Sequence, residues 1–298
     1  MNISRGLYHE RYTWRKSPGG TPGDRPVDGE PRRPLTTPSD MAMWKLSTLV
    51  FFAYAAAVAC VLPGLARERR VRAVAAAALG LVITYAAGRV PLYPVFHLWV
   101  LPLAPLLIAY WTSGLLFVAP MPRVEQILSS FDDRLRIRWL AARTPHWLAQ
   151  FLELAYTGVY PLIPVALGIH MTLTHDANPD RFWTVILTTD YICFAMLPWI
   201  QTRPPRALEP GEPWRASFRT FNFRILHRAS IGVNTFPSGH AAEAVAAALL
   251  VADAPPAIAV WMAFNALAIS AGAVLGRYHY AADALAGAAV AAAVWFVV

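Results

Sequence analysis

Long apolar blocks, rather than short amphipathic periods, dominate the chain from residue 43 onward. Several of these blocks reach the ~20 residues that a helix needs to cross a bilayer. Read in order, they predict eight spans, at about 43–63, 73–88, 93–118, 147–173, 182–200, 237–251, 257–275 and 284–298, with the division of the third block left open. The sequence therefore predicts an all-α fold, a polytopic transmembrane helix bundle with about eight spans.

Two stretches depart from this pattern. Residues 1–40 are polar and rich in Pro, Gly and Arg, so we expect a disordered tail without a cleavable signal peptide. In 121–148, apolar positions recur at helical spacing among charges, which predicts an amphipathic helix in the membrane interface or a solvated linker helix. The expected organisation is a tail (1–40), N-terminal transmembrane helices (41–120), an interfacial helix (121–148) and a catalytic bundle (149–298).

Composition supports a membrane protein and narrows its partners. Apolar residues make up 56% of the chain and charged residues 15%, and nearly all of the net charge of +8 comes from arginine. A basic excess beside spans contacts lipid phosphates or sets topology, whereas nucleic-acid binding needs a basic soluble face that is not visible. Cys60 and Cys193 lie in apolar runs, so neither a disulfide framework nor a metal site is expected, and no cofactor is implied.

The tetrapeptide Pro237-Ser238-Gly239-His240 opens an apolar run of small residues. Proline is favoured at a helix start, where free N–H groups and the positive dipole end attract anions. Ser238 adds a hydroxyl, Gly239 allows close approach to the backbone, and His240 adds a proton donor. The motif fits a phosphate-sized anion, and the alternative is an ordinary turn before a helix.

Two further clusters lie at the ends of neighbouring spans. Arg203 and Arg206 follow the block that ends at residue 200, and Arg277, His279 and Asp283 separate the last two blocks. The end of the span at 182–200, the start of the span at 237–251 and the end of the span at 257–275 lie on the same side of a membrane. Topology therefore predicts that both clusters meet the Pro237–His240 helix start, and this convergence indicates an active site.

The residue types in these clusters are those of covalent phosphoryl transfer without a metal. His279 and Asp283 are four residues apart, on one helix face, so the carboxylate can accept the Nδ1 proton and support a phosphoimidazole. Arginines hold phosphoryl oxygens with a bidentate fork, and His240 can protonate a leaving alkoxide.

With these residues the chain resembles the type 2 phosphatidic acid phosphatase superfamily. That family has the motifs Lys-x6-Arg-Pro, Pro-Ser-Gly-His and Ser-Arg-x5-His-x3-Asp, which are matched here over about 150–298. The resemblance implies that His279 is the nucleophile, Asp283 its partner and His240 the acid. It also implies phosphate binding by Arg203, Ser238 and Gly239.

Two positions depart from the family motifs. Met196 stands where the motif has lysine, and Ala273 stands where it has arginine, so that Arg206 and Arg277 are the nearby basic replacements. The Arg-Pro-Pro and His-Tyr-x-x-Asp forms look closer to the branch that contains inositol phosphorylceramide synthase. That branch transfers a phospho-alcohol head group between lipids, so the acceptor here, water or an alcohol, stays open.

The sequence therefore predicts an integral membrane enzyme that acts on a lipid phosphate, pyrophosphate or phosphodiester through a phosphohistidine. The alternative is a non-catalytic protein that binds or transports lipid phosphates. The resemblance implies a multi-pass protein of the plasma or inner membrane with its site on the extracytoplasmic side, whereas arginines in 67–72 and 123–143 favour the opposite orientation. The roles of Asp190 and Glu243, and the oligomeric state, stay open.

Overall fold

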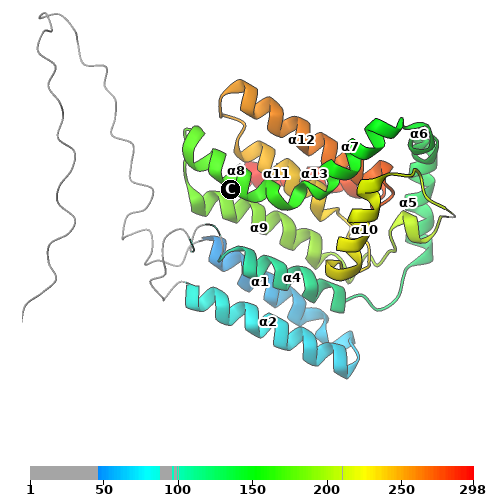
Figure 1. The fold of residues 1–298 in the computed structure, drawn as a ribbon. Coiled ribbons are helices and arrows are strands. Elements are labelled where there is room, and N and C mark those ends of the chain that lie inside the picture. Colours follow the sequence, from blue (N-terminus) through cyan, green and yellow to red (C-terminus); the bar gives the residue numbers. More distant parts are fainter. Residues whose placement is uncertain (1–45, 88–95, 97–98, 100, 210) are drawn as a thin grey trace, which may run out of the picture. The chain divides into compact units, whose positions relative to one another are not determined.

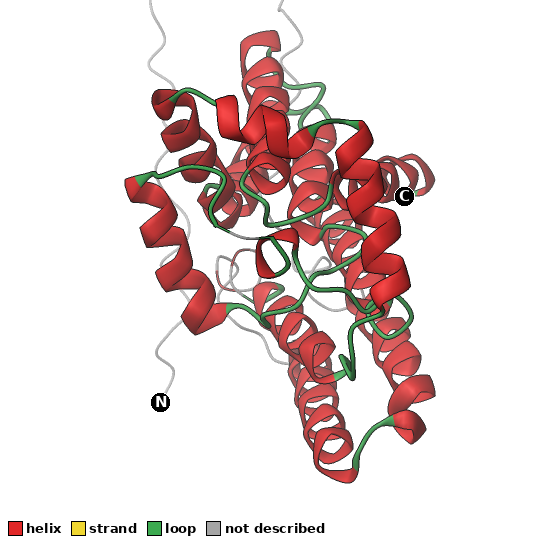
Figure 2. Cartoon of the chain, turned by 90° about the vertical axis from the view of Figure 1, so that its right-hand side faces the viewer, coloured by secondary structure: helices red, strands yellow, loops and turns green. Residues whose placement is uncertain are grey.

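The computed structural model describes residues 46–87, 96, 99, 101–209 and 211–298. Twelve α-helices account for most of these described residues, which contain no strand, only an isolated antiparallel bridge between Thr202 and Asn234 (Figures 1 and 2). The predicted all-α class is therefore confirmed. The expected tail at 1–40 lies outside the described residues, as does the start of the third apolar block.

Five of the described helices lie before residue 144. Their bounds are α1 Leu46–Val61, α2 Arg67–Ala87, α4 Leu103–Leu115, α5 Pro122–Arg134 and α6 Ile137–Arg143, and α7 follows at His146–Thr157. The remaining helices are α8 Val159–Leu173, α9 Pro179–Ala195, α10 Ser217–Ala229, α11 Gly239–Leu250, α12 Pro256–Leu275 and α13 Ala281–Val297.

The prediction of eight spans is wrong for the described helices. Only Leu46–Gly64 and Pro256–Leu275 are long and apolar enough to cross a membrane, and a third candidate arises if α7 and α8 form one span bent by 63°. Apolar helices α4 and α11 have 13 and 12 residues, which is short of the ~20 that a bilayer core requires. These two helices are shorter than the apolar blocks at 93–118 and 237–251 that contain them.

The expected amphipathic helix at 121–148 is also divided. The stretch forms two helices, α5 and α6, instead of one. Arg136, between them, adopts a left-handed φ of 55°, which ends the first helix. Glu125, Leu128 and Asp132 form the buried face of α5, while Ile127 is 67% exposed. Acidic side chains of this segment thus face the bundle, and its place in a membrane interface stays a prediction.

Helix α11 lies at the centre of the bundle, where it packs against α8, α9, α12 and α13 (Figure 1). Its alanines are almost all fully buried, so neighbouring backbones can approach it closely. Gly287 of α13 crosses the start of α11, where an added Cβ would lie 2.4 Å from the Ser238 carbonyl oxygen. The close crossing holds the Ser-Gly-His helix start against α13.

Replacing Gly287 with alanine is expected to destabilise the protein although alanine is the better helix former. The new methyl group meets backbone atoms that cannot rotate away, and overpacking of this kind costs about 1–3 kcal/mol. Thermal unfolding in detergent should show a lower Tm for Gly287→Ala. Gly64→Ala is the matched control, since nothing lies within 4 Å of its added Cβ. Equal Tm values for the two variants would contradict the expected clash.

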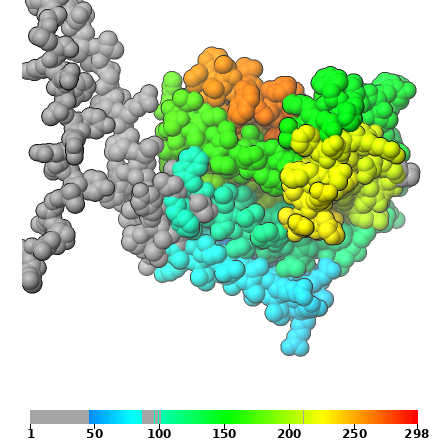
Figure 3. Space-filling model, viewed as in Figure 1, coloured from blue at the N-terminus to red at the C-terminus, as the bar shows by residue number. Residues whose placement is uncertain are grey.

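The segment from residue 201 to 236 is not the plain loop that the apolar pattern suggests, since it contains α10. Arg219 and Asn222 are the buried residues of this helix, and Phe223 and Leu226 beside them are partly buried against Tyr156 and Tyr278. The Thr202–Asn234 bridge joins the two ends of the segment. In Figure 3, α10 lies on the visible surface in yellow.

Candidate active site

Two histidines from different parts of the chain meet at one end of α11. His240 lies in the first turn of α11, and His279 lies in the turn between α12 and α13. The centroids of their rings are 6.0 Å apart, and the ring planes make an angle of 48°. His279 is buried, and the Nε2 atom of His240 has no hydrogen-bond partner among the described residues. The structure therefore brings together the two imidazoles that the sequence singles out.

Asp283 lies beside His279 in the first turn of α13. Its Oδ2 atom is 3.4 Å from the Nδ1 atom of His279 and accepts a 2.9 Å hydrogen bond from the Tyr280 backbone N–H. Asn234 Nδ2 donates to the same oxygen at 2.9 Å and also to Thr202 Oγ1 at 2.9 Å. This carboxylate is held by the helix cap and by Asn234, so it can orient the imidazole and leave Nε2 available.

Ser238 and Gly239 lie where the motif predicts, at the start of α11. The Ser238 hydroxyl accepts from the Ala241 N–H at 3.4 Å as a helix cap, and the Ser238 N–H donates to the Asp283 carbonyl oxygen at 2.9 Å. A Cβ on Gly239 would lie 3.6 Å from Asp190 Oδ1. The helix start is thus joined by its backbone to Asp283.

The His240 imidazole is the last ring in a stack of three and has a fourth ring at its edge. Tyr278 and Tyr156 stack with centroids 4.1 Å apart, and Tyr156 stacks on His240 at 5.0 Å with planes only 7° apart. Tyr160 meets the His240 ring edge-on at 6.0 Å. The sequence places both Tyr156 and Tyr160 on one helix face, and both contact His240 although the helix breaks between them at Gly158.

Two of the predicted phosphate-binding arginines are paired with carboxylates. Glu125 of α5 accepts from Arg203 through Nε at 3.0 Å, through Nη2 at 2.8 Å and through the backbone N–H at 2.8 Å. Arg277 is buried and pairs with Asp132 at 2.6 Å and with Glu209 at 2.5 Å. The two carboxylates enclose the buried Arg277, whereas the Arg203 side chain is 44% exposed and bonds to Glu125 through Nε and Nη2.

Arg206 differs from these two arginines. Its Nη1 donates to the Tyr278 carbonyl oxygen at 3.3 Å, its guanidinium lies 5.1 Å from the Tyr278 ring centroid, and it lies within electrostatic range of His240. No carboxylate pairs with it among the described residues. Burial lowers the pKa of Arg206, which still leaves a guanidinium charged at neutral pH. Arg206 is therefore the cation that an anion between the histidines would meet.

The Glu125–Arg203 pair should make stability depend on pH in the acidic range. Hydrogen bonds from Arg203 hold the pKa of the Glu125 carboxyl below its ordinary value. The pair therefore contributes to the free energy of unfolding at any pH above the unfolded-state pKa, and this contribution is lost as pH falls through the folded-state pKa. Glu125→Gln should therefore have a lower Tm than the wild type at pH 7, and this difference in Tm should become smaller as pH falls toward 3.5. A difference that stays constant across this range would contradict the pair's contribution.

A buried network beneath the histidines joins α7, α10 and the turn that carries His279. The Glu153 carboxylate accepts from Trp214 Nε1 at 2.8 Å, Arg219 Nη1 at 2.8 Å, Asn222 Nδ2 at 2.7 Å and the Tyr278 hydroxyl at 2.6 Å. Arg219 also donates to the Gly276 carbonyl oxygen at 3.0 Å. Through Tyr278, this network fixes the residue next to His279.

Asp190 of α9 is fully buried near the start of α11, and neither of its carboxylate oxygens has a hydrogen-bond partner among the described residues. Glu243 lies one turn along α11 from Gly239 and interacts electrostatically with Asp190. The sequence leaves the roles of both residues open, and the structure brings them close to the predicted site.

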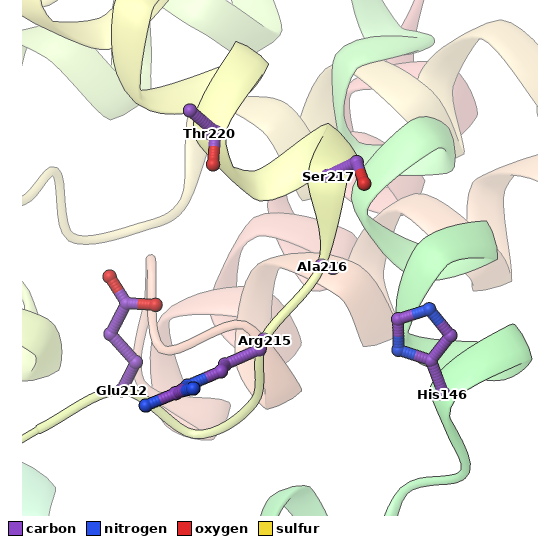
Figure 4. Close-up of a pocket in the computed structure, with 6 residues that line it drawn as sticks. All are labelled: His146, Glu212, Arg215, Ala216, Ser217 and Thr220. Carbon is purple, nitrogen blue, oxygen red and sulfur yellow. The ribbon is translucent and has the colours of Figure 1, made fainter.

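Two cavities follow α10 on its outer side. One of about 370 Å³ is lined by His146, Glu212, Arg215 and Ser217, and Figure 4 shows the Arg215 side chain extending toward Glu212 with His146 of α7 on the other side. The second, of about 770 Å³, is lined by Arg206 together with residues of α10, among them Arg224, His227 and Arg228. Arg206 is thus shared between the second cavity and the surroundings of His240.

The family comparison covers the part of the chain that builds this site. The model of the PAP2 superfamily matches residues 126–297, which include both histidines, Asp283, the arginines and most of α5. No curated protein and no solved structure is significantly similar to the chain. The matched region extends over more than half of the sequence. With its two histidines and carboxylate together at one end of α11, the chain belongs to the PAP2 superfamily, whose members are phosphatases and phosphotransferases that act on phosphate-containing substrates.

Proposed function

We propose that the protein is an integral membrane enzyme that transfers the phosphoryl group of a lipid phosphate, pyrophosphate or phosphodiester through a phosphohistidine on His279. The observation that carries this proposal is the 6.0 Å separation of the His240 and His279 rings, with Asp283 on the Nδ1 side of His279. A phosphate is a suitable ligand for this place, because the start of α11 and Arg206 both favour negative charge.

The proposed reaction has two steps. The Nε2 atom of His279 attacks phosphorus, the P–O bond to the leaving alcohol breaks, and His240 gives its proton to the departing oxygen. Asp283 stabilises the imidazolium that forms on the Nδ1 side. In the second step, water or an alcohol loses its proton to His240 and attacks phosphorus, which breaks the P–N bond and restores His279.

Trapping the phosphoenzyme tests this mechanism directly. Brief incubation of purified protein with a radiolabelled lipid phosphate, followed by alkaline denaturation, should leave label that is stable to base and released by acid. His279→Ala should carry none of this label. Absence of label in the wild type under single-turnover conditions, together with normal substrate binding, would contradict the proposal. The product of the full reaction, free phosphate or a new lipid with a transferred head group, decides between hydrolase and transferase.

A non-catalytic protein that binds lipid phosphates is the second candidate. The observation that favours it is the pairing of Arg203 and Arg277 with carboxylates, while Arg206 is the arginine near the histidines that pairs with no carboxylate among the described residues. A binding protein needs an anion site without charge stabilisation of a transition state. Tight binding of lipid phosphate with equal, negligible phosphate release by the wild type and His279→Ala would support this candidate.

We further propose a multi-pass topology with the histidines on the extracytoplasmic side, as the family resemblance implies. Arg69 donates to the Phe117 carbonyl oxygen, and Gln201 accepts from the Val118 N–H at 2.6 Å, so the α1–α2 connection lies at the same end as the site. A cysteine at Arg72, in a Cys60→Ser background, should therefore react with an impermeant maleimide in intact cells. Labelling only after permeabilisation would place the site on the cytoplasmic side.

A further inference from the structure

The cavity of about 770 Å³ beside α10 has a strongly basic lining. It is bordered by Arg206, Arg224, His227 and Arg228, and Glu212 is the one acidic residue among the residues that line it. Phe223 and Leu226 give it an apolar wall, and Thr220 and Ser230 add hydroxyls. A cavity of this size with several cations and few acids is suited to an anionic group on a small polar or amphipathic molecule.

The arginines of this cavity lack the partners that the other arginines around the site have. Arg203, Arg219 and Arg277 each pair with a carboxylate. In contrast, neither Arg224 nor Arg228 makes an ion pair or a hydrogen bond within the described part of the chain. Glu212, the acid at the cavity wall, lies 3.5 Å from Arg219 Nε and is drawn toward that buried residue. The cavity therefore keeps an uncompensated positive charge.

Arg206 connects this charge to the histidines. Its guanidinium lines the cavity, and it also lies over the ring of Tyr278, the residue that precedes His279. A molecule whose phosphate lies between the histidines and Arg206 can thus extend along α10 toward Arg224 and Arg228. We infer that the cavity binds a second anionic group of the substrate, separate from the phosphate that reacts; this inference rests on the proposed function of the histidine site.

Alkanediol bisphosphates of increasing chain length test the inference, with butyl phosphate as the single-phosphate reference. Binding is measured by calorimetry on the full chain in phosphatidylcholine nanodiscs, which carry no anionic head group to compete. At least one bisphosphate should bind about tenfold tighter than butyl phosphate, since a charge-assisted hydrogen bond contributes affinity of that order. Arg224→Gln/Arg228→Gln should remove the advantage and leave the affinity for butyl phosphate unchanged.

The control is Arg215→Gln, which makes the same substitution at one exposed arginine that lines the other cavity, and each single variant, Arg224→Gln and Arg228→Gln, is its charge-matched counterpart. Arg215→Gln should keep the advantage of the bisphosphate. Equal affinity of the wild type for all probes, or an advantage that survives in the double variant, would overturn the inference. Nanodiscs with phosphatidylglycerol distinguish the sources: if the double substitution changes only the binding of bilayer phosphatidylglycerol, the cavity is a lipid site and the substrate assignment fails.

The binding measurements do not depend on turnover, so the two proposals can fail separately. In His279→Ala protein, the bisphosphate advantage should persist while phosphate release is lost. Bisphosphate binding without any turnover by the wild type would count against the proposed enzyme and leave the second anion site standing. Turnover of a monophosphate without tighter binding of any bisphosphate would support the proposed enzyme and overturn the second anion site.

Discussion

His279→Ala is expected to abolish phosphate release from lipid phosphates, with a loss in kcat of at least about 10⁴-fold, as is found when a covalent nucleophile is removed. The methyl group of alanine cannot attack phosphorus, and the remaining imidazole, His240, is the proposed acid, with its ring centroid 6.0 Å from that of His279. His240→Ala should cost about 10²–10⁴-fold, the range for a general acid. Steady-state phosphate release in detergent, at saturating substrate, measures both losses.

His146→Ala is the matched control, because His146 is an exposed histidine on α7 that lies away from the two rings. It should retain the wild-type rate. Thermal unfolding of each variant separates a lost nucleophile from a lost fold. If His279→Ala keeps more than a tenth of the wild-type rate, a phosphohistidine at this residue is ruled out.

Glu153→Ala is expected to have the largest effect on stability, about 3–5 kcal/mol, the cost of breaking a buried ion pair by removing one partner. The Arg219 side chain is 2% exposed and would lose its buried carboxylate, keeping only the carboxylate of the more exposed Glu212 at 3.5 Å from its Nε. Trp214, Asn222 and the Tyr278 hydroxyl would lose their acceptor as well. Denaturant unfolding in mild detergent, followed by tryptophan fluorescence, measures the change.

Glu68→Ala provides the comparison at the surface. Glu68 and Arg72 form an ion pair 2.7 Å long with side chains 76% and 65% exposed, and such pairs contribute about 0–1 kcal/mol. Similar losses for both variants would mean that the Glu153 network does not anchor α10. Glu153→Gln should fall between them, because the amide keeps an acceptor oxygen but loses the charge that Arg219 pairs with.

The helical class and the meeting of the three clusters could be predicted from the sequence. Both follow from local signals, namely long apolar blocks and motifs at span ends, whose order along the chain restricts where they can meet. The number of spans could not be predicted in this way. Hydropathy registers one apolar run across the break at Gly158, inside the predicted span 147–173, whereas helix length depends on where the backbone hydrogen bonds end.

The carboxylates that pair with Arg203 and Arg277 also could not be predicted from the sequence pattern. Glu125 precedes Arg203 by 78 positions and Asp132 precedes Arg277 by 145, so nothing local links them. Both acids belong to a stretch whose charges suggest a solvated face. The structure instead buries them, because α5 packs against α13 and supplies the counter-charges. The stack of Tyr278, Tyr156 and His240 likewise joins one turn and two separate helices, α7 and α11, and no spacing along the chain predicts it.

The bridge between Thr202 and Asn234 has a consequence for how such a protein can change. It joins the two ends of the intervening segment to each other, and the Asn234 amide joins that pair to Asp283. The buried side of the segment is tied to the site as well, because Arg219 and Asn222 bond to the carboxylate that holds Tyr278. The exposed side of α10, which lines the larger cavity, is free of that constraint, so a redesign of which molecule is accepted would change those outward positions and keep the inward ones.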